Sequence, residues 1–320
     1  MPSRKSRDPE PFHLTLPATS ANLGSAFDAA ALALSIFLKL RARAASEFSI
    51  VARGRDREVC GRLDNHLILT TYREVLEKER KPLVSLALRI ENQIPIGKGC
   101  GSSAAARLAG VALANHFGGL RWSDDRVVGE VARREHHADN AAACWMGGLA
   151  ITRVAADGQA LMASITPKGD WPLLLVISQE ALPTEEARGV LPEQYSRSDV
   201  VTNIQNSMLL LAAFTQGRRD WLAFALADRI HQPYRSTLCP LLPALQSLTG
   251  TKGIAGVALS GAGPSVLIFL HPQFNPQNAS RRIREHLEAH GLSAELITTR
   301  ITSRGGSPRA GKHGAALGPG

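Results

Sequence analysis

The sequence predicts an α+β fold rather than a doubly wound parallel sheet. Stretches with the period-two alternation of strands come in bursts, and stretches with helical periodicity lie between them. Hydrophobic residues make up 44% of the 320 residues and charged residues 20%, the balance of a globular protein with room for one large domain or two ordinary ones. No internal repeat with a period of about 20 to 50 residues is present, which excludes a solenoid.

The first half of the chain contains four stretches typical of strands and three typical of helices. Strands are predicted at residues 12–24, where the strand runs into a loop, 37–53, where there is room for two, 83–92 and 147–155. Helices are predicted at residues 64–80, 102–117 and 123–140. Asp64 or Asn65 is the candidate N-cap of the first helix, and Ser123 with two acidic residues after it suits the start of the third.

The second half begins with an unbroken apolar run at residues 171–178, which is typical of a fully buried strand. Two strands around a glycine turn are predicted at residues 253–270, and a final strand at 294–302. Helices are predicted at residues 200–216, 219–230 and 278–291, the last with Asn278 or Ser280 as its N-cap and Gly291 as its stop. The pattern by itself does not define how this half is arranged.

The net charge of +9 suits either nucleic acid or small anions such as ATP. The segment from Ser303 onward is rich in Gly, Pro and Ser, carries Arg304, Arg309 and Lys312 without an acid, and is expected to be disordered. Basic stretches elsewhere are not interleaved with aromatic residues, which form only 5% of the chain. We therefore expect no nucleic-acid partner.

The cysteines and the N-terminus indicate a cytoplasmic protein. Cys60, Cys100, Cys144 and Cys239 are far apart and form no CxxC pair, which fits a reduced compartment better than a disulfide framework or a zinc site. The basic N-terminus is not followed by the apolar core of a secretory signal. No apolar run approaches the roughly 18 residues of a membrane span, so we expect no membrane partner.

The glycine-rich stretch IPIGKGCGSSAAA at residues 94–106 lies between a predicted strand and a predicted helix. Unpaired backbone N–H groups and the helix dipole favour an anion at such a point, and Gly97, Gly99 and Gly101 let the backbone approach it. Lys98 adds a cation, and Ser102 and Ser103 could cap the helix, bond a phosphate oxygen or ligate Mg²⁺. The stretch therefore predicts an anion site, although a glycine turn capped by serine without a ligand also fits it.

Two further stretches change this interpretation. PATSANLGSAFD at residues 17–28, the glycine loop, and GVALSGAGPSV at residues 256–266 occur in this order. Together they resemble the three motifs of the GHMP small-molecule kinases, over roughly residues 12 to 300. The resemblance implies a two-domain α+β fold, with a ribosomal protein S5 domain 2-like N-terminal domain at residues 11–166 and a ferredoxin-like C-terminal domain at 167–302, followed by the tail at 303–320. The family often forms dimers, and the sequence leaves open whether this chain is a homodimer.

Four local features resemble the homoserine kinase branch of that family. They are the first motif, the stretch HHADNAAACWMGGLAI at 136–151, LPTEEARGVLP at 182–192 and ADRIHQPYR at 227–235. The resemblance implies ATP-dependent, Mg²⁺-dependent phosphorylation of the hydroxyl of L-homoserine in threonine biosynthesis. Another small-alcohol kinase of the family, mevalonate kinase among them, is the alternative. A nucleotide- or nucleic-acid-binding relative without catalysis is the alternative from a different class.

The resemblance also implies which residues form the site. ATP would be bound by Asn65, Pro95, Gly97, Lys98, Gly99, Cys100, Gly101, Ser102 and Ser103. Mg²⁺ would be held by Ser103 and Glu130, with Glu135 as the second choice for the carboxylate. Homoserine would be bound by Asn22, Asp28, His137, Asp139, Thr184, Arg188, Arg235 and Gly261, with both arginines on the carboxylate and Asp28, Asn22 and Asp139 on the ammonium and hydroxyl end.

Asn140 stands where mevalonate kinase-like relatives have an aspartate proposed as a base. An amide cannot accept a proton at ordinary pH, so the implied mechanism is direct attack by the substrate hydroxyl, with Asn140, Ser103 and Glu130 as the catalytic residues. Ala26 departs from the family, which usually has glycine there, and the departure puts the loop's conformation in question.

Two residues near the site have a second interpretation each. His136 and His137 beside Asp139 could suggest a transition metal, but the spacing is poor for one. Cys100 in the glycine loop could be a reactive thiol at a helix N-terminus, although a small buried residue is the interpretation that we favour.

Overall fold

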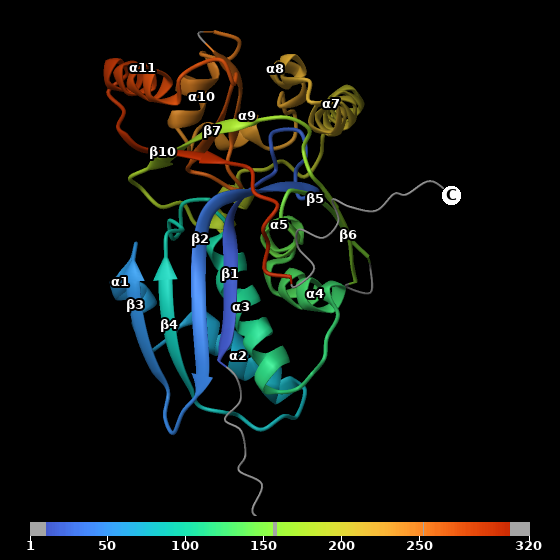
Figure 1. Cartoon of the computed structure of the whole chain (residues 1–320). Helices are drawn as coiled ribbons and strands as arrows, with labels where there is room; N and C mark the ends of the chain where they lie inside the picture. The colour runs from blue at the N-terminus through green and yellow to red at the C-terminus, as the bar shows by residue number, and fades with distance from the viewer. Residues whose placement is uncertain (1–10, 156–158, 252, 308–320) are drawn as a thin grey trace, which may run out of the picture.

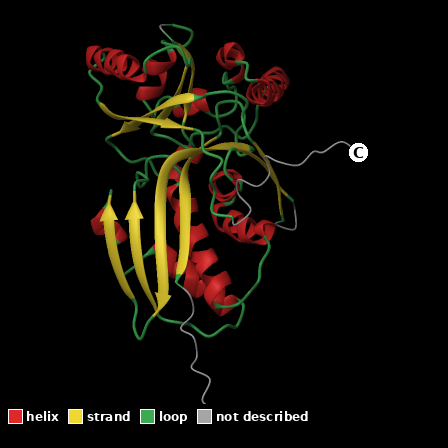
Figure 2. Ribbon diagram, viewed as in Figure 1, coloured by secondary structure: helices red, strands yellow, loops and turns green. Residues whose placement is uncertain are grey.

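A computed structural model describes residues 11–155, 159–251 and 253–307. The chain forms two packed units, one above the other in Figure 1, and each is built on its own sheet. Figure 2 shows that helices and strands contribute to both units, which confirms the predicted α+β class. The proposed domain boundary at residue 166 falls between the last strand of the first sheet and the first strand of the second.

The N-terminal sheet has six strands in the order β3-β4-β2-β5-β6, with β1 paired to β2. These strands are β1 (Phe12–Ala21), β2 (Ala30–Ala44), β3 (Ser49–Gly54), β4 (Leu86–Asn92), β5 (Leu149–Val154) and β6 (Ala160–Ile165). The helices of this unit are α1 (Arg57–Cys60), α2 (Leu67–Lys78), α3 (Ser102–Phe117), α4 (Asp124–Glu135) and α5 (Asp139–Met146). Buried and exposed side chains alternate along β4, so α2 and α3 bury one face of the sheet and leave the other to solvent (Figure 1).

The C-terminal sheet has four antiparallel strands in the order β10-β7-β9-β8. They are β7 (Pro172–Ser178), β8 (Ile254–Leu259), β9 (Val266–Leu270) and β10 (Ala294–Arg300). Around them lie α6 (Thr184–Gly189), α7 (Arg197–Gln216), the 3₁₀ helix η1 (Arg219–Trp221), α8 (Leu222–Ala225), α9 (Gln232–Arg235), α10 (Leu241–Gln246) and α11 (Pro276–Ala289). Every residue of β8 and β9 is buried, which explains their unbroken apolar sequence.

The helix predicted at residues 123–140 is wrong at its end. Ser123 caps α4 as expected, because its hydroxyl accepts from the Arg126 N–H at 3.4 Å. The helix ends at Glu135, however, and His136 takes the left-handed conformation with φ of 65°. The chain then starts α5 at Asp139, which the prediction missed. Because the chain breaks at His136, His137 precedes α5, and Asp139 and Asn140 form the first turn of α5. The three residues therefore lie next to one another and do not point to different sides of one long helix.

Other boundaries also differ from the prediction. The first motif's loop leads into β2 at Ala30, seven residues before the strand predicted from 37. Asp64 and Asn65 are not the N-cap of α2, which is His66, and α11 is capped by Asn275, whose side chain accepts from the Gln277 N–H. The helix predicted at 219–230 is reduced to η1 and α8, because the Asp228 carboxylate accepts from three backbone N–H groups at 230, 231 and 232 and so favours a turn. The strand β6 and the short α1, α6, α9 and α10 were not predicted.

The first five residues of the tail are not disordered. After β10 the chain returns to the N-terminal unit, where the Gly148 N–H donates to the Thr302 carbonyl at 2.7 Å and the Gly306 N–H donates to the Cys144 carbonyl at 3.1 Å. Ser307 donates to the Asp124 carboxylate at 2.8 Å. Prediction of disorder from Ser303 is therefore wrong for residues 303–307, and the rest of the tail, with Arg309 and Lys312, lies outside the described residues.

Among the described residues, no helix has the length and apolar character of a membrane span.

Candidate active site

The glycine loop joins β4 to α3, as predicted, and its three glycines have left-handed backbone angles. The φ angles of Gly97, Gly99 and Gly101 are 70°, 71° and 71°. Gly101 is the N-cap of α3 and no side chain caps this helix, so Ser102 and Ser103 form its first turn instead. The first N–H groups of α3 are therefore free of side-chain caps and suit an anion.

The same loop holds the three sequence motifs together. The Thr19 N–H of the first motif donates to the Cys100 carbonyl at 3.0 Å, and the Ser260 hydroxyl of the third motif donates to the Gly99 carbonyl at 2.8 Å. A Cβ atom at Gly99 would lie 2.3 Å from the Ser260 carbonyl oxygen, and one at Gly101 would lie 1.9 Å from the Thr19 hydroxyl oxygen. Only glycine fits at these two points, because both the space and the φ angle exclude a side chain.

A pocket between the two units collects most of the residues that the sequence predicts for the site. Of those residues, the pocket is lined by Asn22, Asp28, Gly97, Gly99, Cys100, Gly101, Ser102, Ser103, His137, Asp139, Asn140, Thr184, Arg188, Arg235 and Gly261. Four predicted residues do not line it: Asn65, Pro95, Lys98 and Glu130. The pocket therefore combines carboxylates with two arginines and with the backbone N–H groups of the glycine loop.

Asn65 lines a second pocket, which shares Gly97, Ser102 and Ser103 with the first. Its cavity volume is about 920 Å³, which lies within the range of small-molecule sites. The walls are mainly apolar and include the side chains of Ile68, Ile90, Ile94 and Ile96. The serines at the start of α3 therefore separate a polar pocket from a large apolar one.

The structure does not bring Pro95 and Lys98 into either pocket. Both line a shallow depression beside Arg55 and Glu295, and the Lys98 ammonium donates to the Gln179 carbonyl at 2.5 Å. The predicted role of Lys98 as a cation of the anion site is therefore not supported by its position. Its contact instead joins the glycine loop to the end of β7.

Glu130 is not at the site, and Glu135 is. Glu130 is buried away from both pockets and forms ion pairs with Lys78, Arg133 and Arg134. Burial alone would raise its pKa, but hydrogen bonds from these three cations outweigh burial and lower the pKa to about 2. Glu135 lines the first pocket, where its carboxylate accepts from the Ser103 hydroxyl at 2.5 Å. The geometry therefore favours Glu135 over Glu130, the reverse of the predicted preference.

Asn140 lies in a network of short hydrogen bonds. The fully buried Thr19 donates from its hydroxyl to Asn140 Oδ1 at 2.6 Å. Asp139 Oδ1 accepts from the Asn140 N–H at 2.6 Å and is 2.6 Å from His137 Nδ1. Burial alone would lower the pKa of His137, but the hydrogen bond and charge of Asp139 outweigh it and raise that pKa. The amide is oriented by both neighbours, because Asn140 Nδ2 faces Asp139 Oδ1 at 3.3 Å, where the amide oxygen would be repelled.

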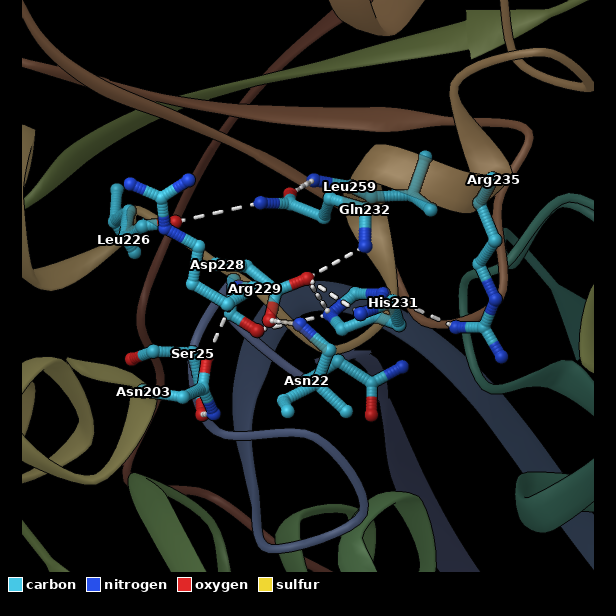
Figure 3. A network of polar contacts seen from close by, with 12 residues as sticks. Asn22, Ser25, Asn203, Leu226, Asp228, Arg229, His231, Gln232, Arg235 and Leu259 are labelled. Atoms are coloured by element: carbon cyan, nitrogen blue, oxygen red, sulfur yellow. Dashed lines mark hydrogen bonds and ion pairs between the residues drawn. The ribbon is translucent and has the colours of Figure 1, made fainter. Parts of the chain in front are cut away.

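The two arginines of the pocket have different environments. Arg188 donates to both oxygens of Asp28, at 2.8 and 3.0 Å, and is partly exposed. Arg235 is 1% exposed and donates to the Ala187 carbonyl at 2.8 Å and, at 3.2 Å, to His231 Nδ1 (Figure 3). Burial, and to a lesser extent the charge of Arg188, lowers the pKa of Arg235 to about 10. Both guanidinium groups lie over the Phe27 ring.

Hydrogen bonds within residues 227–235 fix the position of Arg235. The buried Asp228 carboxylate holds the turn that begins α9 (Figure 3). His231 Nε2 donates to the Gly24 carbonyl at 2.8 Å. His231 is therefore neutral, with Nδ1 free to accept from Arg235, in agreement with a pKa that burial lowers to about 4. In the part of the chain that the structure describes, no carboxylate lies within ion-pair distance of Arg235. A buried cation without a counterion is costly, so the pocket suits a bound anion.

Ala26 does not disturb the first motif. The left-handed φ angles of this loop are at Asn22, Leu23, Gly24 and Asp28, and not at Ala26. The Ala26 N–H donates to the Asn22 carbonyl at 2.9 Å, and the Ala26 side chain is buried. The question raised by alanine in place of glycine is therefore answered: this backbone position does not require glycine.

Cys100 is a buried residue, as the favoured interpretation predicted. It is 1% exposed, and burial raises the pKa of its thiol to about 12. We expect iodoacetamide at pH 8 to modify native protein at Cys100 at least about 100-fold more slowly than free cysteine, because the thiolate is scarce and covered. Mass spectrometry of timed digests measures this rate. Rapid modification that ATP prevents would instead indicate a reactive thiol.

Sequence reasoning missed several residues of the site. Thr19, Phe27 and His231 belong to quoted motifs, so their place in those motifs was the available signal. Leu182 and Ala262 also line the pocket. Side-chain ligand atoms of Asp28, His137 and Asp139 lie within 4.8 Å of one another. His136, which the sequence analysis considered with His137 and Asp139 as a metal site, does not belong to this group.

Two family models match the chain. The GHMP kinases N terminal domain matches residues 66–148, and the GHMP kinases C terminal domain matches residues 210–289. Among curated proteins, a homoserine kinase of Solibacter usitatus is 39% identical over 296 residues, which cover 92% of this chain and 96% of the relative. A homoserine kinase of Synechococcus is 37% identical over 295 residues, 91% of this chain and 96% of the relative.

Solved structures agree on the fold. A homoserine kinase from Cytophaga hutchinsonii superposes with a TM-score of 0.78 at 21% identity, covering 95% of this chain and 98% of that one. An L. major mevalonate kinase superposes with a TM-score of 0.66 at 15% identity, covering 91% and 95% of the two chains. The predicted two-domain α+β fold is confirmed, and the chain belongs to the homoserine kinases of the GHMP kinase family.

Proposed function

We propose that this protein transfers the γ-phosphoryl group of ATP to the side-chain hydroxyl of L-homoserine, giving O-phospho-L-homoserine for threonine biosynthesis in the cytoplasm. The observation that carries the proposal is Arg235. It is a buried guanidinium that lines the same pocket as the glycine loop and lacks a carboxylate partner among the described residues. An amino-acid carboxylate supplies the missing counterion.

The pocket matches an amino acid with a terminal hydroxyl. Arg235 and the exposed side of Arg188 bind the carboxylate, and Phe27 keeps the two guanidinium planes in place. Asp28, with Asp139 and His137 close to it, attracts the ammonium group. Asn22 lines the pocket beside the substrate's polar end, and its amide joins the first motif to the third through the Gly261 carbonyl and the Asp28 N–H. This arrangement requires a zwitterion and disfavours mevalonate, which has no ammonium group.

ATP fits the two adjoining pockets. The nucleoside occupies the apolar pocket that Asn65 lines, and the phosphates lie over the glycine loop at the start of α3. Mg²⁺ prefers a few oxygen ligands, and Ser103 with Glu135 offers a hydroxyl and a carboxylate that already touch. The ion supplies neutralisation of the phosphate charge. We therefore assign the metal-binding carboxylate to Glu135.

Exchange of the two glutamates tests this assignment. Glu135→Gln is expected to lower kcat by about 100-fold or more and to raise the Mg²⁺ concentration needed for half-maximal rate, because a charged ligand is lost. Glu130→Gln is the matched control, and we expect it to lower the free energy of unfolding while it leaves the Mg²⁺ dependence unchanged. Steady-state kinetics over a Mg²⁺ series distinguishes the two. A shifted Mg²⁺ dependence in Glu130→Gln alone would contradict the assignment.

Phosphoryl transfer proceeds here without a protein base. Thr19 donates to Asn140 Oδ1, so that oxygen is occupied and the amide offers an N–H to the reacting groups. The substrate hydroxyl attacks the γ-phosphorus in line, the bond to the leaving ADP oxygen breaks, and the hydroxyl proton passes to a phosphate oxygen or to water.

Asn140→Asp tests the absence of a base. We expect kcat to fall by about tenfold or more, because a carboxylate beside Asp139 adds negative charge next to the phosphates. Rapid-quench measurement of the chemical step reports this directly. An increase of several orders of magnitude would mean that a missing base limits the native enzyme, and would refute the mechanism.

The substrate is tested by ADP release from purified protein with ATP, Mg²⁺ and one of four alcohols: L-homoserine, mevalonate, L-threonine or galactose. We expect turnover with L-homoserine alone. Turnover with mevalonate or galactose would keep the ATP site but refute the roles of Arg188 and Arg235. Absence of turnover with all four, with ATP still bound, would refute the proposed substrate and leave the binding-protein alternative.

A further inference from the structure

The face of the N-terminal sheet that is turned away from α2 and α3, here called the open face, carries charge of almost one sign (Figure 1). Its exposed basic residues in the strands are Lys39, Arg41, Arg43, Arg53 and Arg89. Arg304 adds to them, because its guanidinium group donates to the Thr15 hydroxyl of β1 at 3.2 Å. Within the described bounds of the six strands, Glu91 is the only acidic residue. A basic surface of this kind indicates an anionic ligand.

Cross-strand pairing places like charges opposite each other in one row of the open face. Arg41 of β2 pairs with Arg89 of β4 and, on its other side, with His13 of β1. Directly opposite side chains have Cβ atoms about 5 Å apart, so two arginines there repel each other and destabilise the sheet. The adjacent row differs, because Lys39 pairs with Glu91 and their charged atoms lie 2.9 Å apart. The sheet therefore balances charge in one row and leaves the neighbouring row uncompensated.

A shallow depression lies over the uncompensated row. Its volume is about 490 Å³, which lies within the range of small-molecule sites. The polar side chains that line it are those of His13, Arg41, Arg43, Ser49 and Arg89. Arg43 follows Arg41 by two residues and so lies about 7 Å farther along the same face. In the described part of the chain none of the three arginines forms an ion pair, and neither Glu47 nor Glu91 lines the depression.

The composition of this depression identifies the class of ligand. Three guanidinium groups in so small an area favour a ligand with dense negative charge, and each guanidinium fork can bind a phosphate through two hydrogen bonds. Successive phosphoryl groups of a polyphosphate chain lie closer together than the acidic side chains of a peptide. Nucleotides and single-stranded nucleic acids fit less well, because no aromatic ring among the described residues lines the depression for a base to stack on. A membrane fits less well, since Val51 is the one large apolar side chain exposed in the lining.

We propose that the depression around Arg41, Arg43 and Arg89 is a second anion site of this protein and that its ligand is a short polyphosphate chain without a nucleobase. The ligand removes the repulsion between Arg41 and Arg89, because both guanidinium groups donate to phosphate oxygens. The Ser49 hydroxyl and the His13 imidazole are further donors to the same ligand. The residues of this site line neither the catalytic pocket nor the apolar pocket beside it, so the sites can be occupied together.

Calorimetric titration with inorganic tripolyphosphate tests the proposal. Sodium chloride at about 150 mM screens diffuse attraction to a basic protein. Wild type is expected to bind one equivalent more than Arg41→Gln/Arg89→Gln, in which the affinity of the open face falls at least about 100-fold. Turnover of homoserine by this variant should be unchanged, because its catalytic pocket is intact. Its melting temperature without ligand should equal or exceed that of wild type, because two opposed charges are removed.

Arg53→Gln/Arg304→Gln is the matched control. It removes the same charge from the same face, but neither residue lines the depression. We therefore expect the affinity for tripolyphosphate to change by less than about threefold. Equal weakening by the two double variants would show diffuse attraction and overturn the site. If Arg41→Gln/Arg89→Gln fails to fold, Arg43→Gln replaces it, with an expected loss of about tenfold in affinity.

A short RNA duplex and vesicles that contain phosphatidylserine are titrated in the same way, and we expect neither to bind the open face. If either binds more tightly than tripolyphosphate and is lost in Arg41→Gln/Arg89→Gln, the face belongs to that macromolecule and the proposal is overturned. The proposal is also overturned if wild type binds no more tripolyphosphate than this variant does.

Discussion

Gly101→Ala is expected to reduce kcat/KM by at least about 1,000-fold, corresponding to roughly 4 kcal/mol of lost transition-state stabilisation. A Cβ atom at residue 101 would lie 1.9 Å from the Thr19 hydroxyl oxygen and 3.2 Å from Asn140 Oδ1. It would therefore push apart the two groups whose hydrogen bond orients the Asn140 amide. Steady-state kinetics with L-homoserine and ATP measures the loss, and circular dichroism confirms that the protein is folded.

Gly97→Ala is the matched control for this variant. Gly97 has a φ of 70°, almost the same as the 71° of Gly101, but a Cβ there meets only the Ala181 methyl group at 3.7 Å. Both variants bear the backbone cost of about 1 to 2 kcal/mol, so we expect Gly97→Ala to lose no more than about tenfold. Thr19→Ala should restore part of the Gly101→Ala loss in the double variant, because it removes the clashing oxygen. Equal damage from both single variants would assign the effect to backbone angle alone.

Arg235→Met is expected to raise the KM for L-homoserine by about 100-fold or more, because charge-assisted hydrogen bonds to the substrate carboxylate are lost. The KM for ATP should change by less than about threefold, since the nucleotide lies across the loop from this residue. Thermal unfolding provides the second readout. Arg235 is a buried charge with no carboxylate within ion-pair distance among the described residues, so we expect the melting temperature of Arg235→Met to be equal to or above that of wild type.

Arg229→Met is the control for Arg235→Met. It lies in the same stretch, and its side chain is exposed to solvent. We expect no change in either KM. A fall of several degrees in melting temperature with Arg235→Met, together with equal rises in both KM values, would show that Arg235 is a structural residue and would refute its role in binding the substrate.

The sequence predicted the parts of the site that lie within short motifs. Gly99, Gly101, Asp139 and Asn140 are each required locally, by a turn, a helix start or a close approach, and such requirements leave a readable pattern. The structure brings these residues into one pocket, as predicted.

The site residues that were predicted wrongly are those whose role depends on which face of a helix or loop packs against a neighbouring element. Glu130 and Glu135 lie five positions apart on α4, about 140° apart around the helix, so only one of them can face α3. Nothing in the sequence says which, because the answer depends on how α4 packs. The structure turns Glu130 toward Lys78 of α2 and Glu135 toward Ser103 of α3. Lys98 was assigned to the anion by its place in the loop, and its side chain extends instead to β7.

The helix predicted at 219–230 failed for a different reason. Its first residues have helical periodicity, and α8 does form there. The Asp228 carboxylate then accepts backbone N–H groups of the following residues and starts α9, so a side chain replaces the helical hydrogen bonds. The turn is further stabilised by a hydrogen bond from His231 to the carbonyl of Gly24, which is distant in the sequence. Local periodicity carries no information about such a partner.

The return of the chain after β10 sets the order in which this protein can be completed during synthesis. The four-stranded sheet is an insertion between β6 and residues 301–307, and those residues finish the N-terminal unit through Ala33, Leu34, Cys144 and Gly148. Residues 301–307 are synthesised after both sheets, so the first unit of a nascent chain stays unfinished until they have left the ribosome. We therefore expect the N-terminal unit to reach its final packing only after the C-terminal sheet has been synthesised, and the pocket between the units to be completed after both.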